Sequence, residues 1–271
     1  MKNLFMTIIA YIRLTCYFIV TLLMFITIFP FSWFRINPKY FRKFWWKFYK
    51  ATINIKVEKE GTLVKHRPLL MITNHTSFIE ITALGATINP AFVPKAELRK
   101  MPLLGTIMGK AGCMFIERNP RKAKQETAKL AEKLSKEKSP LLIFPEGTTN
   151  NGNEIKPFKS AMFNIVEHQL GRKDIKEDEK LYIQPAVYYI SNNKSKKSTA
   201  KEREFYAYYV KENPSQEESF IQYMIKILKA GKIKIKMKQL DPIDLSQFSD
   251  RKELAEHCHK IIENEYKKMI K

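Results

Sequence analysis

The chain has 271 residues, of which 45% are hydrophobic and 28% are charged, so it can bury a substantial core in one main domain. Nine glycines and thirteen prolines are too few for a fibrous protein, and three widely separated cysteines cannot form a disulfide framework, which favours a reduced, cytosolic setting. The formal net charge of +21 requires an anionic partner, and nucleic acid and an anionic lipid surface are the two usual candidates.

The first predicted element is an apolar segment, residues 14–34, which contains no charged residue. About 20 apolar residues let a helix cross the hydrocarbon layer, whereas the apolar part of a signal peptide has only about 7 to 15. We therefore expect a retained membrane helix, with Arg13 at its edge, where the side chain can reach the interface. Positive charge is denser after this segment than before it, so the rest of the chain is expected on the cytoplasmic side of an inner or cell membrane.

Residues 35–50 interleave aromatic rings with lysine and arginine, a pattern that indicates an interfacial helix beside an anionic leaflet. An ordinary amphipathic core helix is the alternative. The sequence thus predicts membrane and interfacial helices over residues 1–52, followed by one domain over residues 53–271.

In that domain, short apolar runs alternate with helical patterns, which predicts an α/β fold with a central mixed sheet flanked by helices. The predicted strands are residues 68–73, 92–93, 113–116, 141–144, 181–190 and 232–238. Pro185 is expected to interrupt the fifth of them, and the strict alternation of the sixth predicts a half-buried or edge strand. The predicted helices are residues 78–88, 102–110, 121–137 and 251–271, and residues 191–203 are expected to form an exposed, lysine-rich loop.

Two motifs lie at strand ends, where α/β sheets place their ligands. The first contains His75, whose neutral imidazole can accept a proton near pH 7, and Glu80, a carboxylate that can fix the histidine tautomer. In a regular helix Glu80 would point away from His75, so this pair requires His75 to lie in the turn before the helix, which Thr76 or Ser77 could cap. A single histidine without further motifs is more often structural.

The second motif is Phe144-Pro145-Glu146-Gly147-Thr148, in which a glycine and a hydroxyl residue let backbone amides approach an anion. Lys156 and Lys159 follow in a loop that contains a proline. A strand that simply ends in a Pro-Gly turn is the structural alternative.

Taken in order, four segments resemble the successive blocks of the 1-acylglycerol-3-phosphate acyltransferase family, within the glycerolipid acyltransferase superfamily. They are the segment beginning Asn74-His75, residues 112–118, residues 144–148 and the strand proline Pro185. The resemblance spans roughly residues 70–190, behind an N-terminal membrane segment.

The resemblance implies a membrane-bound enzyme that moves an acyl group from acyl-CoA or acyl carrier protein to a lysolipid, with no metal and no cofactor. In such enzymes the histidine of the first block, paired with an acidic residue five positions later, deprotonates the attacking hydroxyl, which assigns His75 and Glu80. We expect further residues to bind substrate, most of them because they lie in the matching blocks and the lysines because they could supply a cation. They are Asn74, Ser77, Lys95, Arg118, Glu146, Gly147, Thr148, Lys156, Lys159 and Pro185.

The chain departs from the family pattern at two positions. Glu80 stands where the family usually has Asp, and Thr149 stands where an Arg usually follows Gly-Thr. Threonine cannot make the bidentate contact of arginine with phosphate, so either Lys95, Lys156 or Lys159 replaces that cation, or the acceptor is another lysolipid. We expect 1-acylglycerol-3-phosphate as acceptor, which would yield phosphatidic acid. A lysophospholipid or a lyso-aminolipid is the alternative.

Other protein classes fit less well. A nucleic-acid-binding protein would concentrate its cations in a groove or recognition helix, and we expect an anionic membrane rather than nucleic acid as partner. A serine hydrolase would need a Gly-x-Ser-x-Gly elbow, which the sequence lacks. His257 and His259 are two positions apart on a helix and point apart, which argues against a metal site. A non-catalytic, membrane-binding relative stays open because of the two departures.

Overall fold

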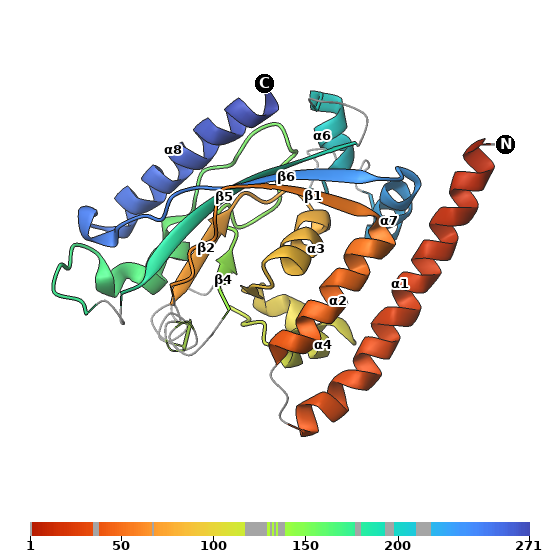
Figure 1. The fold of residues 1–271 in the computed structure, drawn as a ribbon, viewed down its shortest axis with the longest axis horizontal. Coiled ribbons are helices and arrows are strands. Elements are labelled where there is room, and N and C mark those ends of the chain that lie inside the picture. Colours follow the sequence, from red (N-terminus) through yellow and green to blue (C-terminus); the bar gives the residue numbers. More distant parts are fainter. Residues whose placement is uncertain are drawn as a thin grey trace.

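The computed structural model describes residues 2–34, 38–66, 68–116, 129–130, 132, 134, 139–176, 180–192, 198–209 and 218–271. Its centre is a six-stranded sheet with the strand order β1-β6-β5-β2-β4-β3 (Figure 1). The strands are β1 (Ile55–Glu60), β2 (Leu69–Thr73), β3 (Ala91–Phe92), β4 (Leu141–Ile143), β5 (Tyr182–Asn192) and β6 (Ile233–Gln239). Neighbouring strands are parallel except for β5 and β6, so the predicted mixed sheet is confirmed.

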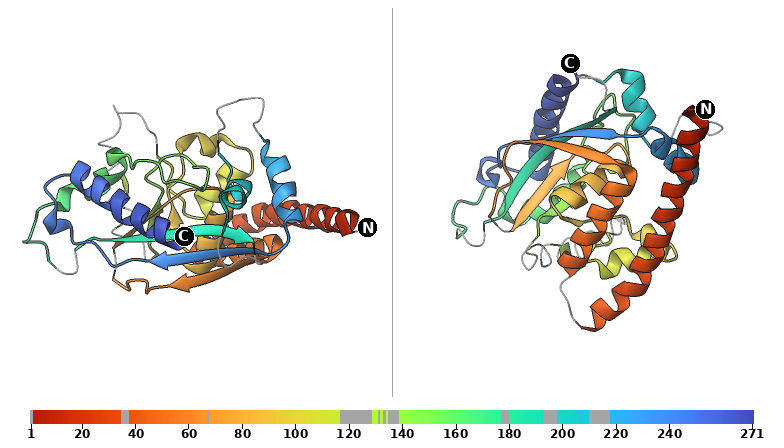
Figure 2. Two further views of the ribbon diagram at one scale, coloured as in Figure 1. Left: turned by 90° about the horizontal axis from the view of Figure 1, so that it is seen from above. Right: turned by 45° about the vertical axis from the view of Figure 1, so that its right-hand side comes forward.

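Helices cover both faces of the sheet (Figures 1 and 2). The α-helices are α1 (Lys2–Trp33), α2 (Pro38–Ile53), α3 (Phe78–Thr87), α4 (Leu104–Lys110), α6 (Ala200–Tyr206), α7 (Phe220–Lys229) and α8 (Arg251–Ile270). Three 3-10 segments are η1 (Ala96–Lys100), η3 (Ser160–Gln169) and η5 (Leu245–Gln247). One hydrophobic core packs α8 and η3 against the sheet, and a second packs α3 and α7 against the opposite face.

The central strand β2 contributes to both cores. Its side chains alternate between them, with Leu70 and Ile72 in the first and Leu69 and Met71 in the second, and all five residues of the strand are buried. A strand buried on both faces reads as a continuous apolar run, as expected for the parallel part of a sheet. This burial holds the end of β2, and the turn that follows it, in a fixed position.

The expectation about β5 is corrected, and the one about β6 is confirmed in its first alternative. Pro185 does not interrupt β5, because it lies just outside the antiparallel ladder, whose first pair is Ala186 and Gln239, so its missing N–H removes no ladder bond. The alternating strand β6 is half-buried as predicted, yet it lies between β1 and β5 and not at an edge. Its lysines reach water beside carboxylates of neighbouring elements, such as Lys234 Nζ at 2.9 Å from Glu58 Oε2.

Two further segments differ from their predictions. Residues 113–116 form no strand beyond a single bridge between Lys95 and Ile116, although Met114 N donates to Phe92 O and so runs beside β3. The predicted loop over residues 191–203 is helical at its end, where Thr199 caps α6, and its first two residues belong to β5. Most of the helix predicted over residues 121–137 lies outside the described residues.

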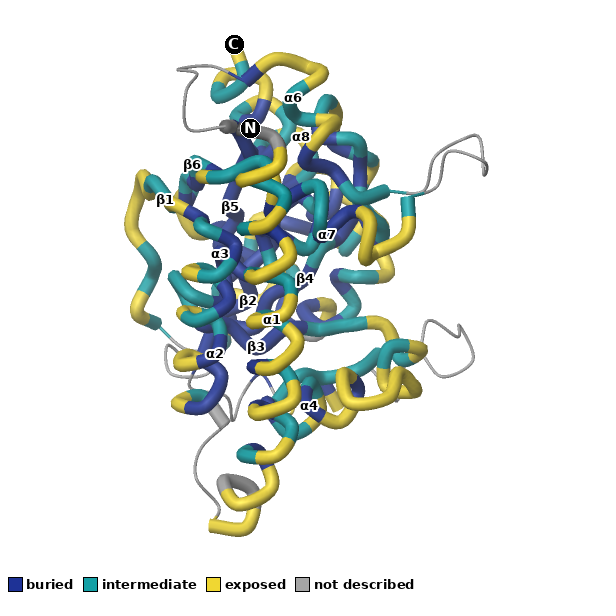
Figure 3. The backbone as a smooth tube through the Cα atoms, turned by 90° about the vertical axis from the view of Figure 1, so that its right-hand side faces the viewer, coloured by how far each residue is buried: buried dark blue, intermediate teal, exposed yellow. Residues whose placement is uncertain are grey.

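The N-terminal helix α1 lies alongside the domain (Figures 1 and 2). Its stretch Leu4–Pro30 has a mean hydropathy of 2.1 and is long and apolar enough to cross a membrane. One side of α1 packs on α2, α4 and α7, while its outward side exposes large apolar residues (Figure 3). Arg13 lies within this helix and within its apolar stretch, and its expected place at the edge of a membrane span stays a prediction.

The second helix, α2, combines the two alternatives considered for it. Phe41, Trp45 and Tyr49 are buried, as in a core helix, while Tyr40 and Phe44 are exposed, as in an interfacial one. α2 packs so closely on α3 that a Cβ atom at Gly85 would lie only 2.3 Å from Trp46 Cδ2. Both N-terminal helices therefore contribute to the hydrophobic cores, and the division at residue 52 stays a prediction.

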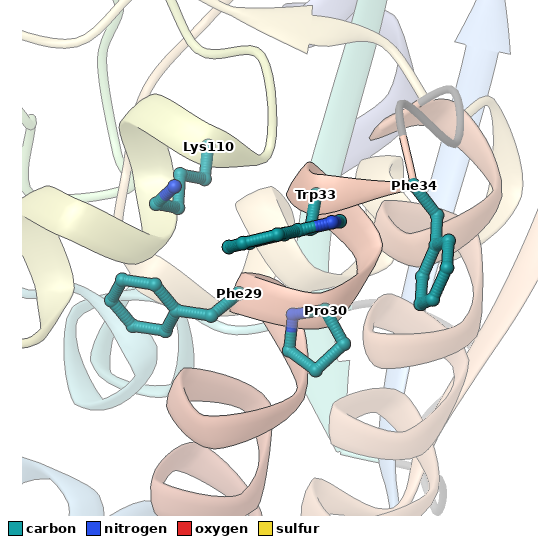
Figure 4. Close-up of a pocket in the computed structure, with 5 residues that line it drawn as sticks. All are labelled: Phe29, Pro30, Trp33, Phe34 and Lys110. Carbon is teal, nitrogen blue, oxygen red and sulfur yellow. The ribbon is translucent and has the colours of Figure 1, made fainter.

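Two hollows lie away from the turn between β2 and α3. One, of about 550 Å³, lies between the end of α1 and α4 and is lined by Phe29, Pro30, Trp33, Phe34 and Lys110 (Figure 4). The other, of about 210 Å³, is lined by the end of η3, by residues between η3 and β5 that include Arg172 and Lys180, and by the start of η5. Neither contains a residue of the turn between β2 and α3.

Candidate active site

The turn after β2 places His75 before the helix, as the predicted pair requires. Ser77 is the N-cap of α3, and its Oγ accepts a hydrogen bond from Ile79 N at 3.1 Å. Glu80, at the third position of the helix, completes a capping box, because its carboxylate turns back to accept from Ser77 N at 2.8 Å. This reversal brings the glutamate carboxylate to the start of the helix, where the imidazole lies.

His75 and Glu80 form a close pair. His75 Nδ1 lies 2.7 Å from Glu80 Oε1, and the same carboxylate accepts from Thr76 N at 2.9 Å. Burial raises the pKa of the Glu80 carboxyl, but the hydrogen bond and charge of His75, with the Ser77 N–H, outweigh burial and hold that pKa below its usual value. The carboxylate is therefore ionised, Nδ1–H donates to it, and Nε2 is left as the basic nitrogen.

The imidazole is held in one plane by Phe144. The two rings stack with their centroids 4.1 Å apart and an angle of 17° between their planes. The His75 side chain keeps 18% of its surface exposed, whereas Glu80 is completely buried. A substrate can thus approach His75 but not its carboxylate partner.

The second motif holds the main chain of His75 from both sides. His75 N donates to Glu146 Oε1 at 2.7 Å, and Asn150 N donates to His75 O at 2.8 Å. The Glu146 carboxylate also accepts from Asn150 Nδ2 and from Lys156 N, each at 2.9 Å. Burial raises the pKa of Glu146, and these hydrogen bonds offset the rise only in part. Glu146 therefore positions the turn and lies on the backbone side of the histidine.

Strand β5 supports the turn through Asn74 and Tyr188. Asn74 Nδ2 donates to Tyr188 O at 2.9 Å, and Tyr188 N donates to Asn74 Oδ1 at 3.1 Å. The Tyr188 hydroxyl accepts from Thr76 N at 2.9 Å and is also hydrogen-bonded to Glu80. Burial, and the nearby Glu80 carboxylate, raise the pKa of Tyr188, so its hydroxyl stays protonated. Asn74 is buried with these contacts, which indicate a positioning role, and its predicted contact with substrate stays a prediction.

The lysines proposed as replacement cations lie near the second motif. Lys156 Nζ donates to Thr149 O at 2.9 Å. The Lys159 side chain lies over Gly147, where a Cβ would be 3.1 Å from Lys159 Nζ, and the φ of +73° at this glycine is a second reason for its lack of a side chain. Thr148 is partly buried in the same turn.

The remaining predicted residues lie elsewhere or are not described. Lys95 precedes η1 and pairs through its backbone with Ile116. Pro185 pairs in register with Ile72, in the sheet below the turn. Arg118 lies outside the described residues. The binding roles of all these residues stay predictions.

An aromatic cluster adjoins the turn and was not expected from the sequence. Its members are Tyr17 of α1, Phe78 of α3, Phe220 and Tyr223 of α7, and Tyr208. The ring of Phe78 lies 6.4 Å from that of Tyr17 and 5.9 Å from that of Phe220, and the Tyr223 hydroxyl, which donates to Tyr206 O at 2.8 Å, lies near Ser77. These contacts bring α1 and α7 to the edge of the candidate site.

Sequence reasoning also missed Asn150 and Tyr188. Asn150 follows Glu146 by four residues, and Tyr188 lies in a buried strand, and neither pattern by itself distinguishes these residues from ordinary structural ones. Among the described residues, no group of three His, Cys, Asp or Glu side chains could hold a metal ion. The rings of His257 and His259 contact different aromatic residues, Phe248 and Phe158. That the reaction needs no metal stays a prediction.

Comparison with known proteins places these features in a family. The lyso-ornithine lipid O-acyltransferase of Pseudomonas aeruginosa is 38% identical over 112 residues, which cover 41% of this chain and 43% of that protein. The protein of the same name from Rhodobacter capsulatus is 29% identical over 77% of this chain and 69% of its own length. The 1-acyl-sn-glycerol-3-phosphate acyltransferase of Saccharomyces cerevisiae is 34% identical over 42% of this chain and 39% of its own length.

The crystal structure of the 1-acyl-sn-glycerophosphate acyltransferase PlsC from Thermotoga maritima has a similar fold. Its TM-score is 0.63 at 19% sequence identity, and the superposition covers 99% of this chain and 97% of that one. The match to the Pseudomonas protein spans less than half of that relative's length. The model of the Acyltransferase family matches residues 54–189, half of the chain, including the His75 turn and the Glu146 motif. The chain therefore belongs to the Acyltransferase family.

Proposed function

We propose that this protein is a lysolipid O-acyltransferase in which His75 is the general base. The observation that carries the proposal is the 2.7 Å contact between His75 Nδ1 and the buried Glu80 carboxylate, which leaves Nε2 free to accept a proton. In the proposed reaction, Nε2 takes the proton from a lysolipid hydroxyl as its oxygen attacks the carbonyl carbon of an acyl thioester. An ester C–O bond forms, the C–S bond breaks, and the imidazolium returns the proton to the leaving thiolate.

Glu80 has an electrostatic role in this reaction. Its ionised carboxylate holds His75 in the tautomer with the proton on Nδ1 and stabilises the imidazolium that forms in the transition state. The extra methylene of glutamate, relative to the aspartate common in the family, is accommodated because the capping box folds the side chain back to the turn. The first departure from the family pattern is thus compatible with catalysis.

For the acceptor, we infer a lysolipid whose head group is an amino acid, and no longer favour 1-acylglycerol-3-phosphate. Two of the relatives described above act on a lyso-ornithine lipid according to their names, and one of them aligns over 77% of this chain. Thr149 takes the place of the usual arginine, and Lys156 Nζ is engaged by the Thr149 carbonyl. The yeast relative keeps 1-acylglycerol-3-phosphate as the second candidate.

The donor in this proposal is acyl-CoA or acyl carrier protein, and the site operates at a membrane. The long apolar helix α1, with its exposed outer side, supports membrane attachment. The excess of positive charge favours an anionic leaflet as the surface that the domain meets.

The test is an acyl-transfer assay on membranes that contain the full chain, with a labelled acyl thioester and a set of lysolipids. The set contains a lyso-ornithine lipid, 1-acylglycerol-3-phosphate and a lysophospholipid. We expect the highest kcat/KM with the lyso-ornithine lipid, and a loss of about 10⁴-fold in His75→Ala, the upper end for general-base assistance. The matched control is His66→Ala, because His66 contacts Lys180 O at 3.1 Å and not the turn.

Full activity in His75→Ala would overturn the mechanism. A preference for 1-acylglycerol-3-phosphate would leave the mechanism intact and overturn the acceptor. No transfer to any lysolipid by the wild-type chain would favour a non-catalytic relative.

A further inference from the structure

Arg13 is a charged side chain that the proposed mechanism does not use. It is the only charged residue in the apolar stretch Leu4–Pro30. Its Nη1 atom is buried and has no hydrogen-bond partner among the residues that the structure describes. A guanidinium in an apolar helix and a buried N–H group without an acceptor are both unfavourable, so such a residue requires a reason.

A second arginine shows what a structural role looks like in this fold. Arg42 of α2 is also buried, and its guanidinium donates to Asn89 Oδ1 at 3.2 Å, to Ala111 O at 2.8 Å and to Ser139 Oγ at 3.2 Å. These bonds join α2 to the ends of α3 and α4. The Nη1 atom of Arg13 makes no such bond in the described structure, so an internal structural role does not account for it.

Arg13 lies on a face of α1 whose neighbouring residues pack near the candidate active site. Residues three and four apart share a face of a helix, so Arg13 lies on the same face as Ala10 and Tyr17. Ala10 is completely buried, and the ring of Tyr17 lies 6.4 Å from that of Phe78, which follows His75 by three residues. This face of α1 packs on α7, whose Phe220 ring lies 5.9 Å from that of Phe78.

The second motif of the site lacks the arginine that usually follows its Gly-Thr pair. Thr149 supplies no cation, and Lys156 Nζ is already bonded to the Thr149 carbonyl. We therefore consider a substrate oxyanion that lies beside the His75 turn, where α1 and α7 pack against it. Such an oxyanion would meet the Arg13 guanidinium near the aromatic cluster. There, little competing water would weaken the contact.

We propose that Arg13 binds an oxyanion, carboxylate or phosphate, in the head group of the lysolipid acceptor. The proposal rests on the function proposed above and adds a specificity-determining residue to it. The oxyanion accepts the hydrogen bond for which Nη1 has no protein partner, and the planar guanidinium orients the head group while the acceptor hydroxyl lies at His75. Arg13 then takes the part of the arginine that Thr149 replaces.

The test compares acceptors that differ by one charge. One pair is N-(hydroxyacyl)-ornithine with a free carboxylate and its methyl ester, and the other is 1-acylglycerol-3-phosphate and 1-acylglycerol. The members are called charged or neutral by this oxyanion alone, because both ornithine lipids also carry a protonated amine. The variants are Arg13→Met and Arg13→Lys, with Lys110→Met as control. Lys110 of α4 is a suitable control because its Nζ lies 4.8 Å from the ring of Phe29 (Figure 4). Phe29 follows Arg13 by 16 residues in α1, which is a distance of about 24 Å along the helix at 1.5 Å per residue.

For Arg13→Met we expect a rise in KM of about 10- to 100-fold for the charged member of one pair, the size of a lost hydrogen bond to a charged group. The neutral member should change less than about twofold, and Arg13→Lys should retain part of the preference because lysine keeps the charge without the planar fork. The pair that responds identifies the oxyanion as carboxylate or phosphate. Equal losses for charged and neutral acceptors, or an unchanged KM for both charged ones, would overturn the proposal.

A binding measurement separates this proposal from the proposed function. Retention of the charged and neutral lysolipids by the purified full chain is measured without an acyl donor, together with the thermal midpoint of unfolding. Arg13→Met should lose the preference for the charged lipid while its midpoint stays equal or rises, because a guanidinium with an unpartnered N–H has been removed from an apolar helix. If the wild-type chain binds both lipids equally, or if Arg13→Met unfolds at a markedly lower temperature, the proposal fails. Both results are independent of turnover.

Discussion

Two buried glutamates, Glu80 and Glu146, hold the His75 turn from opposite sides, and their carboxyl groups are perturbed in opposite directions. Glu80 contacts the imidazole itself, and its pKa is lowered despite complete burial. Glu146 accepts from the His75 backbone N–H, an amide and a second backbone N–H, and burial raises its pKa. The same residue type therefore becomes an electrostatic partner in one place and a positioning group in the other, depending on whether the imidazole ring lies against it.

The largest expected effect that separates the two glutamates is on turnover at Glu80. We expect Glu80→Gln to lower kcat by a factor on the order of 10² to 10⁴, because the amide can still cap the helix but carries no charge to stabilise the imidazolium. Steady-state acyl transfer measures the change. Glu80→Asp serves as the matched variant, since it keeps the charge and should retain more activity. An unchanged rate in Glu80→Gln would reduce Glu80 to a helix cap.

At Glu146 we expect a smaller effect on turnover and a clear effect on stability. Glutamine cannot accept at both of its terminal atoms, so Glu146→Gln leaves either His75 N or Lys156 N without an acceptor. The free energy of unfolding should fall by about 1 to 3 kcal/mol, and kcat by about tenfold through displacement of the turn. Denaturant unfolding and the transfer assay measure the two quantities. A turnover loss as large as that of Glu80→Gln, with unchanged stability, would contradict the distinction.

The smallest expected effect is a difference in how stability depends on pH. Glu80 has a lowered pKa, so its contribution is complete above the usual carboxyl value of 4.5 and is lost as pH falls below it toward the folded-state pKa. Glu146 has a raised pKa, so its contribution is complete below 4.5 and is lost as pH rises through its folded-state pKa. As pH falls from 7 to 3, the stability of wild type relative to Glu80→Gln should therefore decrease, and that relative to Glu146→Gln should increase.

Unfolding curves of the three proteins across this range measure the two slopes. Slopes of the same sign would show that the two carboxyl groups share one environment. Opposite signs would support the difference in their partners.

The sheet and the place of the turn could be predicted because their signals are local. An apolar run such as residues 68–73 marks a strand that is buried on both faces, and the polar residues after it mark its end. The sequence also contains a signal for the direction of the Glu80 side chain, because Ser77 and Glu80 have the spacing of a capping box. From the sequence we predicted only that Thr76 or Ser77 could cap the helix. If the capping box is not considered, a regular helix would direct the Glu80 side chain away from His75.

The support around the turn could not be predicted, because it joins residues distant in sequence. Glu146 is 71 residues from His75, and Tyr188 is 114 residues from Asn74. A sequence does not show which strand end meets which, so Asn150 and Tyr188 carried no signal. For the same reason the place of β6 in the sheet stayed open, because its alternation indicates half-burial but cannot show that β1 covers its outer edge.

The capping box at the start of α3 has a consequence for the population of active molecules. Because the Glu80 carboxylate both caps the helix and contacts His75, fraying of this first turn separates the proposed base from its partner without changing either residue. A cap contributes about 1 kcal/mol, which is a factor of roughly five in the ratio of closed to frayed turns. Loss of the Ser77 hydroxyl would thus shift molecules into a folded but incompetent state, and helix fraying and catalytic competence form a single equilibrium.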